Sequence, residues 1–289
     1  MIYFTDEEID KILTEDVPFY DLTTSILKLE NKPAKIQFFT TEETVVCCTE
    51  EVIKMFKKLS IKPTLFTPSG ETLEANVKFL EGEGLSKNIH VLWRAAENLI
   101  SYSSGIATAV KYLVDIAKSV NPDVIVTTTR KVFPYTRKIV AKAVQAGGAC
   151  IHRLGLSETI FIFENHYCFL GNINNLKKRL KDQYSLIGDK TITVEVRTIE
   201  QALQIAEADI NIIQCSSFSP LEIKQLKEIL NSRSSKIKIA AAEGITDENI
   251  REYVSAGADI IITSWPYRSS PKRIKVIISP LDDDGSWLI

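Results

Sequence analysis

The sequence has little of what disulfide-rich, metal-binding or membrane-spanning proteins require. Its 289 residues include only five cysteines and three histidines, and no two cysteines have C-x-x-C spacing. An odd number of cysteines in mostly apolar surroundings favours buried, reduced thiols over a disulfide or zinc framework. No apolar run approaches the roughly 20 residues of a membrane-spanning helix. The formal net charge of −2 gives no global positive field of the kind that binds nucleic acid or anionic membranes.

Several short motifs that identify enzyme classes are also missing. The chain contains no P-loop, no G-x-G-x-x-G, no G-x-S-x-G and no H-E-x-x-H. Its histidines, at positions 90, 152 and 166, are too scattered for metal-ligand spacing. The first ten residues, MIYFTDEEID, carry no basic segment and turn acidic at once, so we expect no signal peptide and predict a cytoplasmic protein.

The first third of the chain predicts a compact region of mixed helices and strands. Thr5 and Glu8 have capping-box spacing before an amphipathic segment, which predicts a short first helix. Residues 86–120 form a long amphipathic segment. We expect two helices there, meeting at the small residues Ser103, Ser104 and Gly105. Strand-like runs occupy 36–41, 45–48, 63–67 and 73–80, with a helix from residue 49.

After residue 120 strand-like and helical segments alternate. This alternation predicts a parallel sheet covered by helices, and the number of units favours a barrel, complete or open, over a doubly wound sheet. A last strand-like run at 274–278 could rejoin the N-terminal region. The seven strand-like runs of the alternating part are 124–129, 149–151, 160–163, 191–196, 210–214, 236–241 and 259–263.

Two pairs of basic residues each follow one of these strands directly. Arg130 and Lys131 come after 124–129, and His152 and Arg153 come after 149–151. If the two strands are parallel neighbours, the four side chains meet at one edge and suit a polyanionic ligand. Taken singly, each residue could instead be a solvated surface charge. An aldolase that uses Lys131 as a Schiff-base amine is a weaker alternative.

Three further sets of candidates depend more on context. Glu195, an acid in the strand TITVEV, could contact a metal–diphosphate or a ribose hydroxyl, or pair with Arg197. The loops after the last two barrel strands often hold phosphate, which makes Gly244, Thr263 and Ser264 candidates. Arg94, judged by its neighbours alone, is a surface arginine.

Three segments together resemble the quinolinate phosphoribosyltransferase family, also called nicotinate-nucleotide pyrophosphorylase (carboxylating). These are WRAAENLISYSSGIAT, TTRKVFPYTR and AGGACIHRLGLSETIFIFENH. HRLGLSET and TSWPYRSSPKRIKV are nearer to the ModD branch of this family, which is associated with molybdenum transport. The similarity extends over essentially the whole chain.

The resemblance implies a fold and an assembly. The fold is α/β, with an N-terminal α/β sandwich at 1–105, an open α/β barrel at 106–268, and a return of 269–289 to complete the sandwich. The family forms homodimers, sometimes assembled further, in which a helix arginine from one subunit enters the site of the other. Arg94 matches that arginine, which reverses the surface interpretation.

The resemblance also implies a reaction. The family transfers phosphoribosyl from phosphoribosyl pyrophosphate to quinolinate, with Mg²⁺ as cofactor and diphosphate as product. Glu195 matches the acid near the ribose and Mg²⁺ and, with Lys131, is the expected catalytic pair. The expected acceptor-binding residues are Arg94, Arg130, Lys131, His152 and Arg153, and the expected phosphate-binding residues are Ala242, Glu243, Gly244, Thr263 and Ser264.

Four positions depart from the quinolinate enzyme. Phe163 stands in place of a lysine, Ser216 in place of an acid, Ile151 in place of an asparagine, and Arg197 in place of a second acid. The expected acceptor is an anionic nitrogen heterocycle, quinolinate or a related acid, and the loss of a cation and of acids weakens the case for quinolinate itself. A non-catalytic anion-binding protein that serves molybdenum handling remains the alternative, and Glu243, a carboxylate in a phosphate loop, adds to it.

Overall fold

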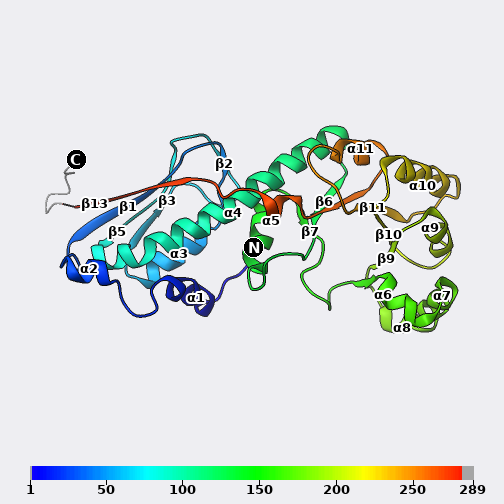
Figure 1. Cartoon of the computed structure of the whole chain (residues 1–289), viewed down its shortest axis with the longest axis horizontal. Helices are drawn as coiled ribbons and strands as arrows, with labels where there is room; N and C mark the ends of the chain where they lie inside the picture. Colours follow the sequence, from blue (N-terminus) through cyan, green and yellow to red (C-terminus); the bar gives the residue numbers. More distant parts are fainter. Residues whose placement is uncertain (1, 282–289) are drawn as a thin grey trace. The chain divides into compact units, whose positions relative to one another are not determined.

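The computed structural model describes residues 2–281, which fall into two compact units (Figure 1). The first unit comprises the chain up to Lys111, then Phe133–Gly148, and the chain from Arg268 on. The second comprises Tyr112–Val132 and Ala149–Tyr267. Of the expected C-terminal return at 269–289, positions 282–289 lie outside the described residues. Within 2–281, no helix combines the length and apolar character needed to cross a membrane.

The first unit is built on an antiparallel sheet of four strands in the order β13-β1-β5-β3. Strand β13 pairs with β1 from Ala34↔Pro280 to Thr40↔Ile274, which confirms the predicted return of the C-terminal strand. The elements of this unit are α1 (Asp6–Asp16), α2 (Leu22–Ile26), β1 (Pro33–Thr40), β2 (Thr44–Val45), α3 (Thr49–Lys58), β3 (Lys62–Leu65), β4 (Thr72–Leu73), β5 (Lys78–Leu85), most of α4 (Ser86–Val120), α5 (Arg137–Ala146) and β13 (Ile274–Pro280).

Alternation along β1 explains how this sheet acquires its core. Ala34, Ile36 and Phe38 are buried, while the residues between them are partly exposed. Because successive strand residues point to opposite faces, one face of the sheet is apolar. That face packs in one cluster with buried residues of α3 and α4, such as Phe56 and Leu92. The predicted capping box at the start of α1 is also present, with Glu8 N donating to Thr5 Oγ1 at 3.2 Å.

The prediction of two helices at 86–120 is wrong, because α4 runs unbroken through the small residues. Ser103 and Ser104 are fully buried. The Ser103 hydroxyl donates to Leu99 O at 2.7 Å, and Ser104 Oγ accepts from Cys47 N at 3.0 Å. A Cβ on Gly105 would lie 2.5 Å from Ser270 O. The small residues therefore allow neighbouring backbone to approach the helix closely, and they do not end it.

We expect Gly105→Ala to lower the free energy of unfolding by about 1–3 kcal/mol, because the added methyl overlaps a backbone oxygen that no rotamer change can move. Alanine's better helix propensity, about 1 kcal/mol, offsets only part of this. Urea unfolding measures the change. Gly155→Ala is the matched control, since a Cβ there meets nothing within 4 Å. Equal stability of the two variants would contradict the close contact between Gly105 and the backbone of Ser270.

The second unit contains a seven-stranded parallel sheet in the order β7-β6-β12-β11-β10-β9-β8. Its seven strands correspond to the seven predicted runs. The elements are β6 (Ile125–Thr128), β7 (Cys150–Ile151), β8 (Ile160–Ile162), α6 (Glu164–Tyr167), η1 (Cys168–Leu170), α7 (Ile173–Asp182), α8 (Tyr184–Ile187), β9 (Ile192–Val196), α9 (Ile199–Ile205), β10 (Ile212–Ser216), α10 (Pro220–Ser232), β11 (Lys238–Ala242), α11 (Ile250–Ser255), β12 (Ile260–Thr263) and η2 (Trp265–Arg268).

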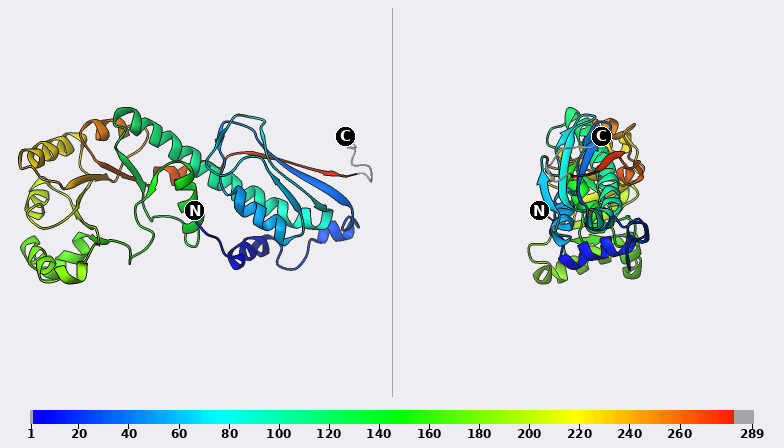
Figure 2. Two further views of the ribbon diagram at one scale, coloured as in Figure 1. Left: turned by 180° about the vertical axis from the view of Figure 1, so that it is seen from behind. Right: turned by 90° about the vertical axis from the view of Figure 1, so that its left-hand side faces the viewer.

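This sheet is an open barrel, as predicted. Strands β7 and β8 follow one another in the chain but form the two opposite edges of the sheet. The connection between them, residues 152–159, therefore crosses the open side. Helices α9 and α10 lie outside the strands that they follow (Figure 1), and the view from behind shows the same arrangement (Figure 2).

Candidate active site

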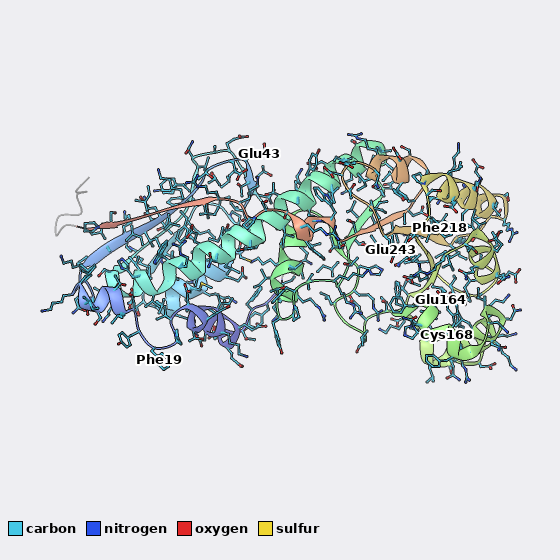
Figure 3. All side chains as sticks on the ribbon, in the orientation of Figure 1. Phe19, Glu43, Glu164, Cys168, Phe218 and Glu243 are labelled. Carbon is cyan, nitrogen blue, oxygen red and sulfur yellow. The ribbon has the colours of Figure 1, made fainter. Side chains whose placement is uncertain are left out.

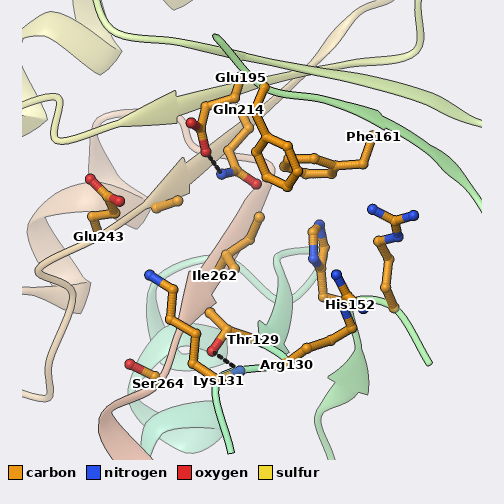
Figure 4. A pocket seen from close by; sticks show the side chains of 13 residues that line it. Thr129, Arg130, Lys131, His152, Phe161, Glu195, Gln214, Glu243, Ile262 and Ser264 are labelled. Carbon is orange, nitrogen blue, oxygen red and sulfur yellow. Dashed lines mark hydrogen bonds between the residues drawn. The ribbon is translucent and has the colours of Figure 1, made fainter. Parts of the chain in front are cut away.

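A pocket of about 330 Å³ opens at the carboxyl ends of the parallel strands of the second unit (Figure 4). This end of an open or closed α/β barrel is where functional side chains normally gather. The volume suits a small molecule. Its walls are Thr129, Arg130, Lys131, His152, Arg153, Phe161, Phe163, Glu195, Gln214, Ala242, Glu243, Ile262 and Ser264.

The two basic pairs meet in this pocket because β6 and β7 are parallel neighbours. Thr127 pairs with Cys150 and Thr128 with Ile151, so the residues after each strand emerge at the same edge. Among residues 2–281, no carboxylate lies within ion-pair distance of Arg130 or Lys131. Positive charge that the protein does not neutralise is the arrangement expected of an anion site.

The loop that carries Arg130 and Lys131 is held by three hydrogen bonds. Thr129 N donates to Thr263 O at 3.1 Å, and the Tyr267 hydroxyl donates to Thr129 O at 2.6 Å. Lys131 N donates to Thr129 Oγ1 at 3.3 Å. These bonds fix the backbone from which both cations extend, which limits the entropy lost when a ligand binds.

The Arg153 side chain makes most of its hydrogen bonds to backbone carbonyls of its own loop. Its Nε donates to Gly155 O at 3.2 Å, and its Nη2 donates to Leu156 O and Thr159 O at 3.3 and 3.2 Å. The residue is 6% exposed. Arg153 therefore supports the connection that crosses the open side of the barrel, while still contributing positive charge to the pocket wall.

His152 lies between the loop arginines and the aromatic wall. Its ring meets Phe161 edge to face, with centroids 5.4 Å apart. Burial, followed by the positive charges of Arg153 and Arg130, lowers the pKa of His152 below its usual value, against a smaller opposing effect of Glu158. The imidazole is therefore mainly neutral at pH 7 in the empty pocket.

We expect the pocket to bind a carboxylic acid more tightly as the pH falls from about 7 towards 5. A bound anion offsets the two arginine charges and raises the pKa of His152, so binding takes up a proton and is favoured at lower pH. Isothermal titration across this range measures the slope. His152→Asn should flatten the slope, and an equally steep slope in that variant would assign the proton to another group.

Glu195 faces Gln214 across neighbouring strands. The two residues pair in the register of β9 and β10, and Gln214 Nε2 donates to Glu195 Oε2 at 2.9 Å and approaches Ser216 Oγ at 3.4 Å (Figure 4). Arg197 does not pair with Glu195 but lies 3.5 Å from Glu164. Gln214 was not among the predicted site residues, although an amide between the apolar residues Ile213 and Cys215 is a usable signal.

The carboxyl ends of β11 and β12 and the loops after them contribute Ala242, Glu243 and Ser264 to the pocket but not Gly244 or Thr263. The hydroxyl of buried Thr263 donates to Ile245 O at 2.7 Å, so it shapes the loop rather than the cavity. Glu243 is in the left-handed region, with φ 70°, and its Oε2 accepts from Ser217 Oγ at 2.7 Å. Such backbone strain is common at ligand sites.

Arg94 lies in the first unit, on α4. Its side chain is 49% exposed, and its Nη1 is 2.7 Å from Glu97 Oε2. The guanidinium also lies over the Trp93 ring, 4.0 Å from the centroid. These contacts hold the arginine at the surface, and its entry into the site of a second subunit stays a prediction.

Phe163, which stands where the resemblance expects a lysine, forms an aromatic wall with Phe161. The two ring centroids are 4.5 Å apart. His166 stacks on Phe163 at 5.1 Å, and its Nδ1 accepts from Phe163 N at 3.0 Å. The other departures are less prominent, since Ser216 is buried behind Gln214 and Ile151 is only half-buried.

Curated relatives match most of the chain, and two of them illustrate the match. "Putative pyrophosphorylase ModD" of Pasteurella multocida is 36% identical over 281 residues, which cover 96% of this chain and 99% of the relative. "Probable nicotinate-nucleotide pyrophosphorylase (carboxylating)" of Methanocaldococcus jannaschii is 33% identical over 255 residues, covering 87% and 88%. The crystal structure of nicotinate-nucleotide pyrophosphorylase from Ehrlichia chaffeensis aligns with a TM-score of 0.86 at 26% identity, covering 96% of this chain and 100% of that one.

Two family models account for nearly all of the sequence. The model of the quinolinate phosphoribosyl transferase N-terminal domain matches residues 21–104, and that of the C-terminal domain matches residues 106–273. The second match contains every residue that lines the pocket. The chain therefore belongs to the quinolinate phosphoribosyltransferase family, whose members are pentosyltransferases.

Proposed function

We propose that this protein transfers phosphoribosyl from phosphoribosyl pyrophosphate to a small anionic nitrogen heterocycle and releases diphosphate. The observation that carries the proposal is the cation pair Arg130 and Lys131, which no carboxylate within residues 2–281 neutralises, in the same pocket as the carboxylate of Glu195. Cations at one wall suit an acidic acceptor, and a carboxylate at the opposite wall suits a ribose that gains positive charge. Both requirements belong to one glycosyl transfer.

Each group has a separate task in this reaction. Arg130 and His152 orient the acid of the acceptor, with Lys131 as a point charge for the acceptor or a phosphate. Glu195, held by Gln214 at 2.9 Å, stabilises the oxocarbenium-like ribose as its bond to diphosphate lengthens. Ser264 and Ala242 lie at the loops that would face the phosphate end of the donor.

Mg²⁺ fits this pocket as a partner of diphosphate rather than as a resident of a protein cage. Within the described chain, no group of three or more acidic, histidine or cysteine side chains could hold a metal. Mg²⁺ commonly needs only one or two carboxylates when phosphates complete its shell, and Glu195 and Glu243 both line the pocket. Bound there, Mg²⁺ would neutralise charge on the leaving diphosphate.

We also propose a homodimer, in which Arg94 reaches the site of the partner. The first unit exposes apolar side chains that a second copy could cover, and Phe19, which projects from the loop before α2 (Figure 3), is 91% exposed. Large apolar side chains that cluster at a surface commonly mark an interface. Sedimentation of the purified chain tests the assembly. The exposed group is Phe19, Tyr20, Leu22, Ile26 and Leu27.

The deciding experiment measures diphosphate release from phosphoribosyl pyrophosphate and Mg²⁺, with quinolinate, nicotinate and other heterocyclic acids as acceptors. Turnover with any one of them supports the transferase. Turnover with quinolinate would mean that Phe163 and Ser216 are tolerated. Acid binding without turnover would favour the alternative, an anion-binding protein in molybdenum handling, and Glu243 in the phosphate loop is the observation behind that alternative.

A further inference from the structure

Gln214 is a buried polar side chain with only half of its hydrogen-bonding capacity used inside the protein. The residue is 6% exposed and lines the pocket. Its Nε2 donates to Glu195, but its Oε1 has no hydrogen-bond partner among the described residues. An unpaired buried amide oxygen is costly, and native proteins seldom keep one without a use.

The orientation of the amide follows from its neighbour. A carboxylate offers only acceptor atoms, so the Gln214 amide must turn its NH₂ towards Glu195, which lies 2.9 Å away. The reversed amide would place Oε1 against Oε2 of Glu195 and would lose this bond. Oε1 is therefore the atom left for a ligand, and it can only accept a hydrogen bond. Protein atoms cover this oxygen in the empty pocket, so a ligand reaches it only when the Gln214 amide turns towards the cavity.

The strand order separates Gln214 from the cations. Arg130 and His152 follow β6 and β7, whereas Gln214 lies on β10, and β12 and β11 stand between them in the sheet. Figure 4 shows Arg130 and His152 on one side of the cavity and Gln214 with Glu195 on the other. A flat ligand whose acid faces the cations would turn its far edge towards Gln214 Oε1.

The far side of the pocket repels a second acid. Phe163 forms an apolar wall there, and its ring centroid lies 4.5 Å from that of Phe161, which in turn contacts His152. A carboxylate beside Phe163 would face the oxygens of Gln214 and Glu195, all of which are acceptors. An amino group or ring N–H in the same place would complete the unpaired Oε1.

We propose that the acceptor is a heteroaromatic ring with a single acidic group and, on its opposite edge, a hydrogen-bond donor, and that Gln214 determines this specificity. This inference rests on the proposed acceptor pocket and specifies the class of acid that it takes. Phe163, which supplies no charge where the resemblance expects a lysine, is the second residue behind this specificity.

The test compares equilibrium binding of nicotinate, its 5- and 6-amino derivatives, whose amino groups lie on the edge away from the acid, and quinolinate by calorimetry. We expect at least one amino derivative to bind at least about tenfold more tightly than nicotinate, because it satisfies a buried acceptor. Quinolinate should bind more weakly than that derivative. Methionine has a volume similar to that of glutamine but no amide oxygen. In Gln214→Met the affinities for the amino derivative and for nicotinate should therefore differ by no more than about twofold.

Gln37→Met is the matched control. Gln37 also donates to a glutamate, with its Nε2 2.7 Å from Glu81 Oε2, but it lies in the sheet of the first unit. This variant should keep the amino preference of the unaltered protein. Phe163→Lys should raise the affinity for quinolinate, since it returns a cation to the wall.

The outcomes separate this inference from the proposed function. Diphosphate release with quinolinate preferred, or an amino preference that survives Gln214→Met, would overturn the specificity while the transferase stands. If an amino derivative of nicotinate binds selectively but no diphosphate is released with it, the result would support the proposed specificity and overturn the proposed transferase activity. If Gln214→Met does not fold, the ranking of ligands by the unaltered protein decides alone, and a ranking led by nicotinate or quinolinate overturns the inference.

Discussion

Arg130→Ala should reduce kcat/KM for the heterocyclic acceptor by about 100-fold or more, and acceptor binding measured alone should fall in parallel. The Arg130 guanidinium lines the pocket and has no carboxylate in ion-pair range within the described chain, so its charge is available to an acid. Losing one partner of a desolvated charge pair generally costs about 2–5 kcal/mol. A 100-fold reduction in kcat/KM corresponds to about 2.7 kcal/mol and falls in this range. Arg130→Lys, which keeps the charge but not the planar fork, should lose less.

The fold should not suffer, because removing one of several clustered cations relieves repulsion. Burial and the nearby Arg130 and Arg153 charges depress the pKa of His152, so Arg130→Ala should also raise that pKa, which NMR titration can follow. Arg251→Ala is the control, since Arg251 lies on α11 and donates to Ser119 Oγ at 3.2 Å. Unchanged acceptor kinetics in Arg130→Ala would remove this residue from the site.

The position of the cations could be predicted from sequence because it depends on one periodic pattern. Short β-branched runs predict buried parallel strands, and parallel strands deliver the residues that follow them to one edge. This rule alone predicts that Arg130 and His152 lie at one edge of the sheet. The register Thr128↔Ile151 in the structure shows that the two strands end side by side. The same rule places Glu195 at its strand end without any knowledge of its partner.

What sequence could not supply is the partner of each polar group. Arg153 and Arg130 look alike in sequence, yet three backbone carbonyls occupy Arg153. Those bonds depend on the path of residues 152–159 between two sheet edges, which no local pattern encodes. Gly105 was misread for the same reason. Its neighbour in space, Ser270, is distant in sequence, so a close packing contact looked like a helix end.

A buried ion network in the first unit has no signature in the local sequence. Lys142, on α5, is 9% exposed, and its Nζ donates to Glu51, which is 2% exposed, and to Glu50 Oε2 at 2.7 Å. Ser69 N and Oγ donate to the same Glu50 carboxylate at 2.9 and 2.5 Å. Burial acts to raise the pKa of Glu50, but the bonds from Lys142 and Ser69 outweigh it and lower that pKa to about 2.

Lys142→Met should lower the free energy of unfolding at pH 7 by about 3–5 kcal/mol, because it leaves the Glu51 carboxylate buried without its cation. Lys11→Met is the matched control. Lys11 pairs with Glu7 at 2.8 Å, but both side chains are more than two-thirds exposed, so this variant should lose less than about 1 kcal/mol. Urea unfolding at several pH values measures both. Equal losses in the two variants would show that burial does not strengthen the Lys142 network.

The pH dependence separates loss of charge pairing from loss of packing. A folded-state pKa of about 2 for Glu50, against an ordinary value of 4.5, means that its contribution is present above pH 4.5 and disappears as the pH falls towards 2. The gap between the unaltered protein and Lys142→Met should therefore narrow over that range. Glu51→Gln in the Lys142→Met background should recover part of the stability at pH 7, since a neutral amide costs less to bury than an unpaired carboxylate. A gap that stays constant down to pH 2 would assign the loss to packing of the lysine stem.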